Sequence, residues 1–131
     1  MMNTLPPAVV VHGIEEARLA LAPGHPVLLL SAPGAAAYAG AGWWRALIHA
    51  ADTRQPDALD CADEPGRALE ALATGCRILI LHPCPAFATI RQRAPHALLL
   101  TERPPALDFS QPGAARHLVP WLLGDSPAGI G

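Results

Sequence analysis

The sequence predicts an α/β fold built on one parallel sheet. Five short apolar runs recur along the 131-residue chain, and amphipathic segments separate them. Strands that are buried on both faces of a parallel sheet have unbroken Val, Ile and Leu runs of this kind. The runs start about 20 residues apart, with one longer gap, which is typical of alternating strands and helices. They comprise residues 8–11, 27–30, 58–59, 78–81 and 97–100.

The first two runs and the segment between them predict a strand–helix–strand unit. Residues 8–11 are Ala-Val-Val-Val, and the apolar residues from Ile14 to Leu21 then recur on one helical face. Gly24 follows where a helix C-terminal cap belongs. Residues 27–30, Val-Leu-Leu-Leu, are too short and too evenly apolar for anything but a buried strand.

The longest helical region is predicted over residues 35–51. Its first half consists of small residues and includes Gly40 and Gly42, which weaken a helix, so we expect part of it to be loop. From Trp43 onward apolar residues recur at helical spacing. The strand that follows, residues 57–61, is the weakest prediction because it is short and contains two acidic residues.

The second half of the chain continues the alternation. Asp63 is predicted to cap a helix that Gly75 ends, and a strand follows over residues 77–81. A helix through Phe87, Ile90 and Ala94 then leads to a strand over residues 96–101. Two prolines open an extended connection after Arg103, and the last predicted helix spans residues 114–123, with Pro120 inside it or at its end.

These elements predict a single domain over residues 1–124 and a flexible tail over residues 125–131. The architecture we expect first is three-layered, with about five parallel strands in a flavodoxin-like or Rossmann-like arrangement. The alternative is half of a βα-barrel that a second copy of the chain completes or shields.

The composition predicts a homo-oligomer, most simply a dimer. Hydrophobic residues make up 51% of the chain and charged residues only 15%, which leaves apolar surface to cover. Tyr38, Trp43 and Trp44 cluster in the sequence, and adjacent tryptophans point about 100° apart on a helix, so we expect the tryptophans at this interface. A net charge of −2 gives no reason to expect nucleic acid or an anionic membrane as a partner.

Several chemistries are excluded by residues that the chain lacks. All nine basic residues are Arg, which is typical of a GC-rich bacterial genome. Without Lys the chain can form neither a Schiff base nor a Walker-type phosphate loop. Three cysteines without a paired framework, and an N-terminus without a signal-peptide pattern, predict a cytoplasmic location. The uncharged stretch 25–44 contains too much Pro and Gly to be a membrane span.

The candidate site lies where the strands end. Ligands of parallel α/β proteins bind beyond the carboxyl ends of the strands, and residues from neighbouring strand ends can meet there. The polar, thiol and small residues that follow the runs are His12, Ser31, Gly34, Asp60, Asp63, His82, Cys84, Glu102 and Arg103. The plainer explanation is that these residues cap helices and satisfy backbone groups in loops.

Individual residues suggest more specific roles. Cys84 is expected to open a helix, where a thiolate is favoured, but a phosphatase loop would need Arg where Ile90 stands. Gly34 would let backbone approach a phosphate or, more simply, permit tight packing. The spacing of histidines and carboxylates fixes no metal site, and the sequence indicates no cofactor.

Two classes of function follow. The first is a homo-oligomeric domain that binds a small molecule or a partner at the strand ends. The second is a small lyase, isomerase or hydrolase that uses His12 or His82 as acid or base, with Asp60 or Glu102 nearby. We favour the first because no pairing of a nucleophile with a base can be named from the sequence.

Overall fold

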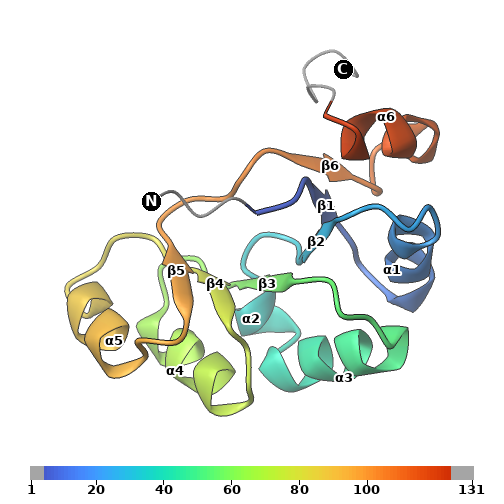
Figure 1. The fold of residues 1–131 in the computed structure, drawn as a ribbon. Coiled ribbons are helices and arrows are strands. Elements are labelled where there is room, and N and C mark those ends of the chain that lie inside the picture. The colour runs from blue at the N-terminus through green and yellow to red at the C-terminus, as the bar shows by residue number, and fades with distance from the viewer. Residues whose placement is uncertain (1–4, 125–131) are drawn as a thin grey trace.

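The computed structural model describes residues 5–124 and confirms an α/β fold with one all-parallel sheet (Figure 1). The sheet has six strands, one more than expected. The additional strand, Ala106–Asp108, follows the double proline that we interpreted as part of an extended connection. The predicted tail over residues 125–131 lies outside the described residues. The strands are β1 (Ala8–Val10), β2 (Leu28–Leu30), β3 (Asp57–Asp60), β4 (Ile78–Ile80), β5 (Leu98–Leu100) and β6 (Ala106–Asp108).

The strand order is β5-β4-β3-β2-β1-β6, and every neighbouring pair is parallel. The chain therefore adds β2 to β5 one after another in one direction and then returns to place β6 on the other side of β1. All six carboxyl ends lie at one edge of the sheet, as the sequence predicted. The sequential order of β1 to β5 is a property that this layout shares with half of a βα-barrel.

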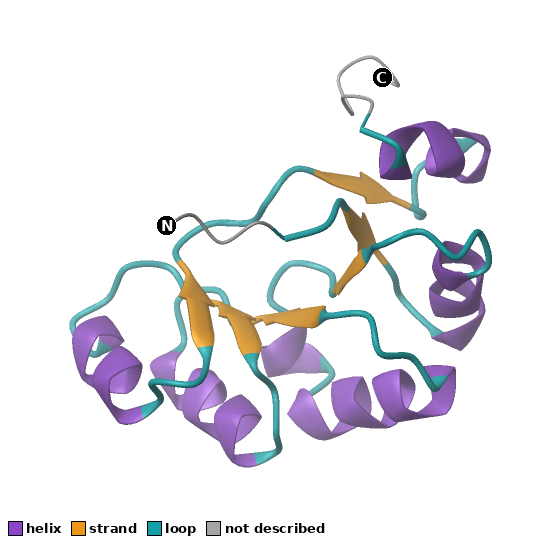
Figure 2. Ribbon diagram, viewed as in Figure 1, coloured by secondary structure: helices purple, strands orange, loops and turns teal. Residues whose placement is uncertain are grey.

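Right-handed crossovers that all step in one direction place their helices on one face of a sheet. The helices are α1 (Ile14–Leu21), α2 (Ala35–Tyr38), α3 (Ala41–Ala51), α4 (Pro65–Ala73), α5 (Phe87–Arg93), the 3₁₀ helix η1 (Ala114–His117) and α6 (Leu118–Leu122) (Figure 2). Each contributes buried residues to the same core cluster as Val9, Leu29 and Leu79. The helices therefore pack on one face of the sheet, whereas we expected helices on both faces in a three-layer arrangement.

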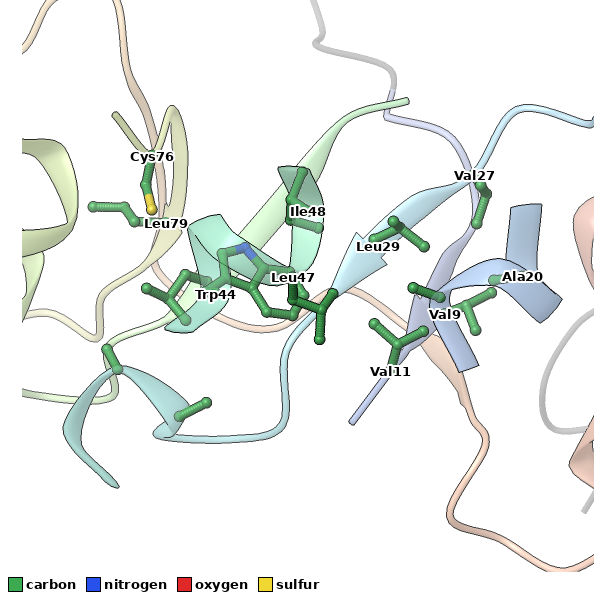
Figure 3. Close-up of a cluster of buried hydrophobic side chains, with 14 of the residues drawn as sticks. Val9, Val11, Ala20, Val27, Leu29, Trp44, Leu47, Ile48, Cys76 and Leu79 are labelled. Atoms are coloured by element: carbon green, nitrogen blue, oxygen red, sulfur yellow. The ribbon is translucent and has the colours of Figure 1, made fainter. Parts of the chain in front are cut away.

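Trp44 of α3 is the largest fully buried side chain of this core (Figure 3). Its indole Nε1 donates a hydrogen bond to Asp57 Oδ1 at 2.9 Å, so the buried polar atom has a partner. Trp43, the preceding residue of the same helix, keeps 37% of its surface exposed. Of the two tryptophans predicted at a dimer interface, only Trp43 is therefore available to a second chain.

The opposite face of the sheet, which we call the helix-free face, carries Ala8, Val10, Leu28, Leu30, Ala58 and Ile80. Within residues 5–124 no helical residue belongs to this second cluster. The connection from β5 to β6, residues 101–105, must run from the carboxyl end of one edge strand to the amino end of the other, and Figure 1 shows it crossing between them. We call this connection the strap.

The helix boundaries agree with the sequence prediction at some positions and differ from it at others. The predicted helix 35–51 is two helices, because Gly40 adopts φ +92° between α2 and α3. Asp63 does not cap α4: Glu64 occupies the N-cap position, without a side-chain hydrogen bond to the helix. Gly75, at φ +101°, turns the chain from α4 towards β4, as expected. Pro120 lies inside α6, within its first turn, where its missing N–H is tolerated.

None of the helices within residues 5–124 has the length and apolar character needed to span a bilayer.

Candidate functional site

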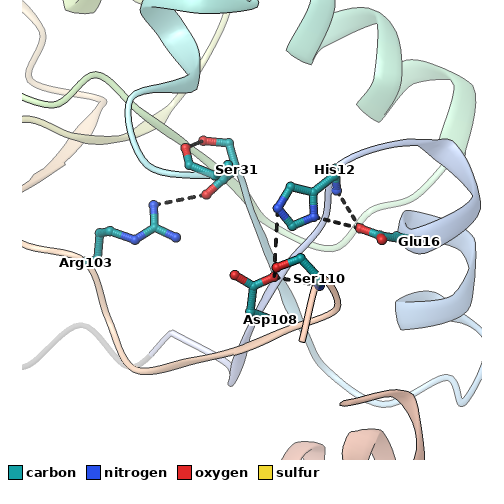
Figure 4. A network of polar contacts seen from close by, with 7 residues as sticks. His12, Glu16, Ser31, Arg103, Asp108 and Ser110 are labelled. Atoms are coloured by element: carbon teal, nitrogen blue, oxygen red, sulfur yellow. Dashed lines mark hydrogen bonds and ion pairs between the residues drawn. The ribbon is translucent and has the colours of Figure 1, made fainter. Parts of the chain in front are cut away.

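Two polar clusters form at the carboxyl edge of the sheet. The first joins the ends of β2 and β3 to the strap, and the second joins the ends of β1 and β6 to helix α1. Four of the nine residues predicted from the sequence belong to these clusters, and Figure 4 shows parts of both at the same edge. They are His12, Ser31, Asp60 and Arg103.

The first cluster is centred on the Asp60 carboxylate, whose side chain is only 2% exposed. Arg103 Nη1 donates to Asp60 Oδ2 at 2.8 Å and to the backbone carbonyl of Ser31 at 3.0 Å. The backbone N–H of Ala62 donates to the other carboxylate oxygen at 2.7 Å. Both oxygens of this buried acid thus have strong donors, which is the condition for a carboxylate to remain charged inside a protein.

Side-chain alternation along β3 explains how Arg103 reaches Asp60. Successive residues of a strand point to opposite faces, so Asp60 shares a face with Ala58, which lies on the helix-free face. The strap that carries Arg103 crosses that same face. The ion pair therefore fastens the strap to the sheet, and the guanidinium of Arg103 is already neutralised by a protein carboxylate.

Ser31 supports the same corner through its hydroxyl. Its Oγ accepts the backbone N–H of Asp60 at 2.9 Å and donates to the Ala32 carbonyl at 3.1 Å, and the residue is fully buried. Ser31 and Asp60 are the two buried polar residues within the described chain. Their hydrogen bonds are internal to the protein, so this cluster corresponds to the plainer, structural explanation of strand-end polar residues.

The second cluster is centred on His12 (Figure 4). Nδ1 of its imidazole lies 2.9 Å from Glu16 Oε1, and Nε2 lies 3.8 Å from Asp108 Oδ1. The first distance is a hydrogen bond, and the second exceeds hydrogen-bond reach. Ser110 donates its hydroxyl to the same Asp108 oxygen at 2.8 Å. The side chains of His12 and Asp108 remain 36% and 32% exposed, so this cluster, unlike the first, faces solvent.

Local sequence rules place Glu16 against His12. Gly13 is the extended residue at the N-cap of α1, so Glu16 occupies the third helical position. A Glu at that position can turn back and accept a free backbone N–H, as in a capping box. Here Glu16 Oε1 accepts the backbone N–H of His12 at 2.8 Å as well as contacting the imidazole. The acid therefore fixes both the backbone and the ring of His12.

Strand topology places Asp108 on the other side of the ring. Asp108 is the last residue of β6 and pairs in register with Val10 of β1. The chain leaves β1 towards α1 and β2, whereas it leaves β6 towards η1 and α6 on the outer side of the sheet (Figure 1). Parallel sheets bind ligands at such a switch point, where neighbouring strands send their connections in opposite directions.

A shallow depression adjoins this cluster. It has a volume of about 390 Å³ and is lined by residues 12–16, from the end of β1 to the first turn of α1. His12 was predicted from the sequence, whereas Glu16, Asp108 and Ser110 were not. The spacing of four residues between His12 and Glu16 was a usable signal, because it matches one helical turn.

Five predicted site residues belong to neither cluster. His82 Nδ1 lies 3.2 Å from the backbone carbonyl of Thr101, an isolated contact at the far end of the sheet. Gly34 adopts φ +68° before α2, a left-handed conformation that favours glycine, and a Cβ added there would make only an ordinary contact with the Ala62 Cβ, at 4.0 Å. Asp63 and Glu102 are exposed.

Cys84, the fifth, does not open a helix as predicted, because α5 begins three residues later, at Phe87. It is half-buried and packs against the helical core. The other two thiols are buried. Burial raises the pKa of Cys61 to about 12 and that of Cys76 to about 11, so both stay protonated at neutral pH. None of these features indicates a thiolate nucleophile.

Within residues 5–124, no three His, Cys, Asp or Glu side chains lie close enough together to hold a metal ion. Comparison of the chain with protein-family models, with curated proteins and with solved structures gives no match. The function is therefore argued from the site itself.

Proposed function

We propose that this protein binds a small polar molecule at the carboxyl edge of its sheet, at the switch point between β1 and β6. One observation carries the proposal. The solvent-facing imidazole of His12 lies between carboxylates from two different elements, Glu16 of α1 and Asp108 of β6. A merely structural cluster would enclose its polar groups, as the Asp60 cluster does, whereas this one leaves about a third of each side chain open.

The atoms around His12 indicate the class of ligand. Glu15 and Glu16 line the depression, and Asp108 lies 3.8 Å from the His12 imidazole beside it. The guanidinium of Arg103, at the same edge of the sheet, is paired with Asp60. Oxygen acceptors dominate, so the ligand should carry hydrogen-bond donors. We therefore propose a molecule that bears an ammonium group, hydroxyl groups or both, rather than an anion.

Titrations monitored by NMR of the histidine ring Cε1–H signals test this proposal. Diethanolamine supplies an ammonium group with hydroxyls, glycerol supplies hydroxyls alone, and malonate is an anion of similar size. The His12 signal should move most with diethanolamine, less with glycerol and least with malonate. The substitution Asp108→Asn should weaken the response to diethanolamine at least about five-fold, as expected for the loss of a charged hydrogen-bond partner.

The matched control is Asp63→Asn, which removes an exposed carboxylate at the end of another strand. It should leave the titration unchanged. A His12 response that is equal for diethanolamine and malonate, or equal losses in the two variants, would contradict a donor-binding site at this position.

Catalysis is the second candidate function, and one distance favours it. Glu16 Oε1 contacts Nδ1 of His12 at 2.9 Å, and Nε2 faces Asp108 Oδ1 at 3.8 Å, beyond hydrogen-bond reach. A carboxylate that orients an imidazole in this way is the arrangement of a general base, so a lyase, isomerase or hydrolase activity is compatible with it. Hydrolysis of p-nitrophenyl acetate should then be at least about five-fold slower in His12→Gln than in the control His49→Gln. Equal rates in the two variants would leave binding as the only supported function.

We further propose that the protein is a cytoplasmic homodimer of bacterial origin with a Rossmann-like arrangement of its site. Tyr38 and Trp43, which are 70% and 37% exposed, support an apolar contact beside α3. Three free cysteines support a reducing compartment. Sedimentation equilibrium should show a dimer that Trp43→Ser weakens and that Leu123→Ser, at another exposed apolar residue, does not. A monomeric wild-type protein would contradict the dimer.

A further inference from the structure

A second cavity lies at the opposite edge of the sheet, far from His12. It has a volume of about 560 Å³, which is within the range of pockets that hold small molecules. The lining comes from α4 and α5 and from the two turns that lead into β4 and β5. These turns precede their strands, so the cavity opens at the amino edge and shares no residue with the candidate site.

The sequence explains why a space remains between α4 and α5. Leu69 and Leu72 are three residues apart on α4, and Ile90 is on the facing side of α5, so all three point into the gap. Ala73 is the last residue of α4 and Ala94 is the C-cap residue of α5, and both are too small to fill the gap. Leu69 remains 50% exposed, an apolar surface that an occupant would cover.

The polar part of the lining is basic. Arg77, Arg93 and His96 line the cavity together with these apolar walls. Among the lining residues that the structure describes, none is acidic. Across residues 5–124, neither Arg77 nor Arg93 has a carboxylate within ion-pair distance, whereas Arg45, Arg67 and Arg103 each have one.

The inner wall carries no competing negative charge. Cys76 lies there almost completely buried, and burial raises the pKa of its thiol to about 11. It is therefore a neutral, weakly polar surface at neutral pH. Asp57 lines an adjoining groove, where its carboxylate already accepts hydrogen bonds from Trp44 and Arg45.

We propose that this cavity binds an amphipathic monocarboxylate, with its aliphatic chain between α4 and α5 and its carboxylate on the guanidinium groups of Arg77 and Arg93. Apolar walls take the chain, and a guanidinium pairs with a carboxylate through two parallel hydrogen bonds. Charge complementarity selects this occupant over a neutral or cationic amphiphile of the same length.

Calorimetric titrations with octanoate, octanamide and octylammonium test the proposal, since the three differ only in the head group. Octanoate should bind at least about ten-fold more tightly than either of the others, the difference expected for charge-assisted hydrogen bonds. The methyl NMR signals of Leu69, Leu72 and Ile90 should shift during the octanoate titration. Equal affinity for octanoate and octylammonium would overturn the proposal.

Variants locate the head group and the chain. Arg93→Gln should weaken octanoate binding about ten-fold, whereas Arg91→Gln should not, because Arg91 is an exposed arginine of the same helix that does not line the cavity. Ala73→Phe should abolish binding by filling the gap, with an unchanged circular dichroism spectrum as evidence of folding. Equal losses in Arg93→Gln and Arg91→Gln, or full octanoate binding by folded Ala73→Phe, would overturn the proposal.

Discussion

Arg103 of the strap donates a 2.8 Å hydrogen bond to the carboxylate of Asp60, a residue 43 positions earlier at the end of β3. The acid is almost completely buried and the arginine is 23% exposed. Within the described chain, the strap is the only connection between strands that crosses the helix-free face. The ion pair joins the strap to the middle of the sheet. The ion pair gives Asp60 and Arg103 a structural role, although their positions near strand ends predicted a binding role.

The first prediction concerns this ion pair. Arg103→Met should lower the free energy of unfolding by about 3 kcal/mol, because it leaves the Asp60 carboxylate buried without its cation. Urea denaturation followed by the fluorescence of the three tryptophans measures the loss. Arg67→Met is the matched control: it breaks an exposed pair with Glu70 and should cost about 0.5 kcal/mol or less. Similar losses in the two variants would contradict a structural role for the Asp60 pair.

The Ser31 hydroxyl gives the second prediction. Ser31→Ala removes the acceptor of the Asp60 backbone N–H and should destabilise the protein by about 1–2 kcal/mol, since a buried donor then has no partner. Ser110→Ala removes an exposed hydroxyl and should change the stability by about 0.5 kcal/mol or less. The same denaturation experiment compares the two, and a neutral Ser31→Ala variant would show that its hydrogen bond contributes little.

The buried thiols predict how stability depends on pH. Their pKa values in the folded protein are about 12 for Cys61 and about 11 for Cys76, against 9.0 for an ordinary thiol. Above pH 9 the unfolded chain loses these protons and the folded chain keeps them, so unfolding becomes more favourable as the pH rises. Between pH 9 and 11 the free energy of unfolding should fall by about 1.4 kcal/mol per pH unit for each such thiol.

Denaturation at a series of pH values checks this dependence against a Cys61→Ala, Cys76→Ala double variant. That variant should lose the slope above pH 9. Tyr38→Phe, which changes an exposed side chain and leaves both thiols in place, serves as the control and should retain the slope. A slope that survives the removal of both thiols would mean that other groups cause it.

The fold was predictable because its strands are continuous apolar runs with parallel crossovers between them. β6 was missed because Ala106–Asp108 is three residues long and follows Pro104-Pro105, a pair that normally marks an extended loop. The sequence predicted that part of the region 35–51 is loop, but not that the interruption falls at Gly40. Strand order was beyond the sequence, because apolar runs of similar composition do not specify their neighbours.

Part of the candidate site was predictable from the sequence, because the apolar runs mark where the strands end. His12, Ser31, Asp60 and Arg103 follow from their positions at or near strand ends, but their division into a closed and an open cluster depends on the strap and on β6. Asp108 could not be recognised as a site residue while β6 was unrecognised. The cavity between α4 and α5 arises from small side chains on two helices, a feature that no motif in the sequence marks.

The most direct test of the account is a crystal structure of the protein soaked with diethanolamine. We expect the ammonium group within hydrogen-bond distance of Asp108 and a hydroxyl near Nε2 of His12, with Glu16 still holding Nδ1. Diethanolamine bound elsewhere with the His12 site unoccupied, or a His12 ring turned away from Glu16 and Asp108, would contradict the claim that the switch point between β1 and β6 is the ligand site.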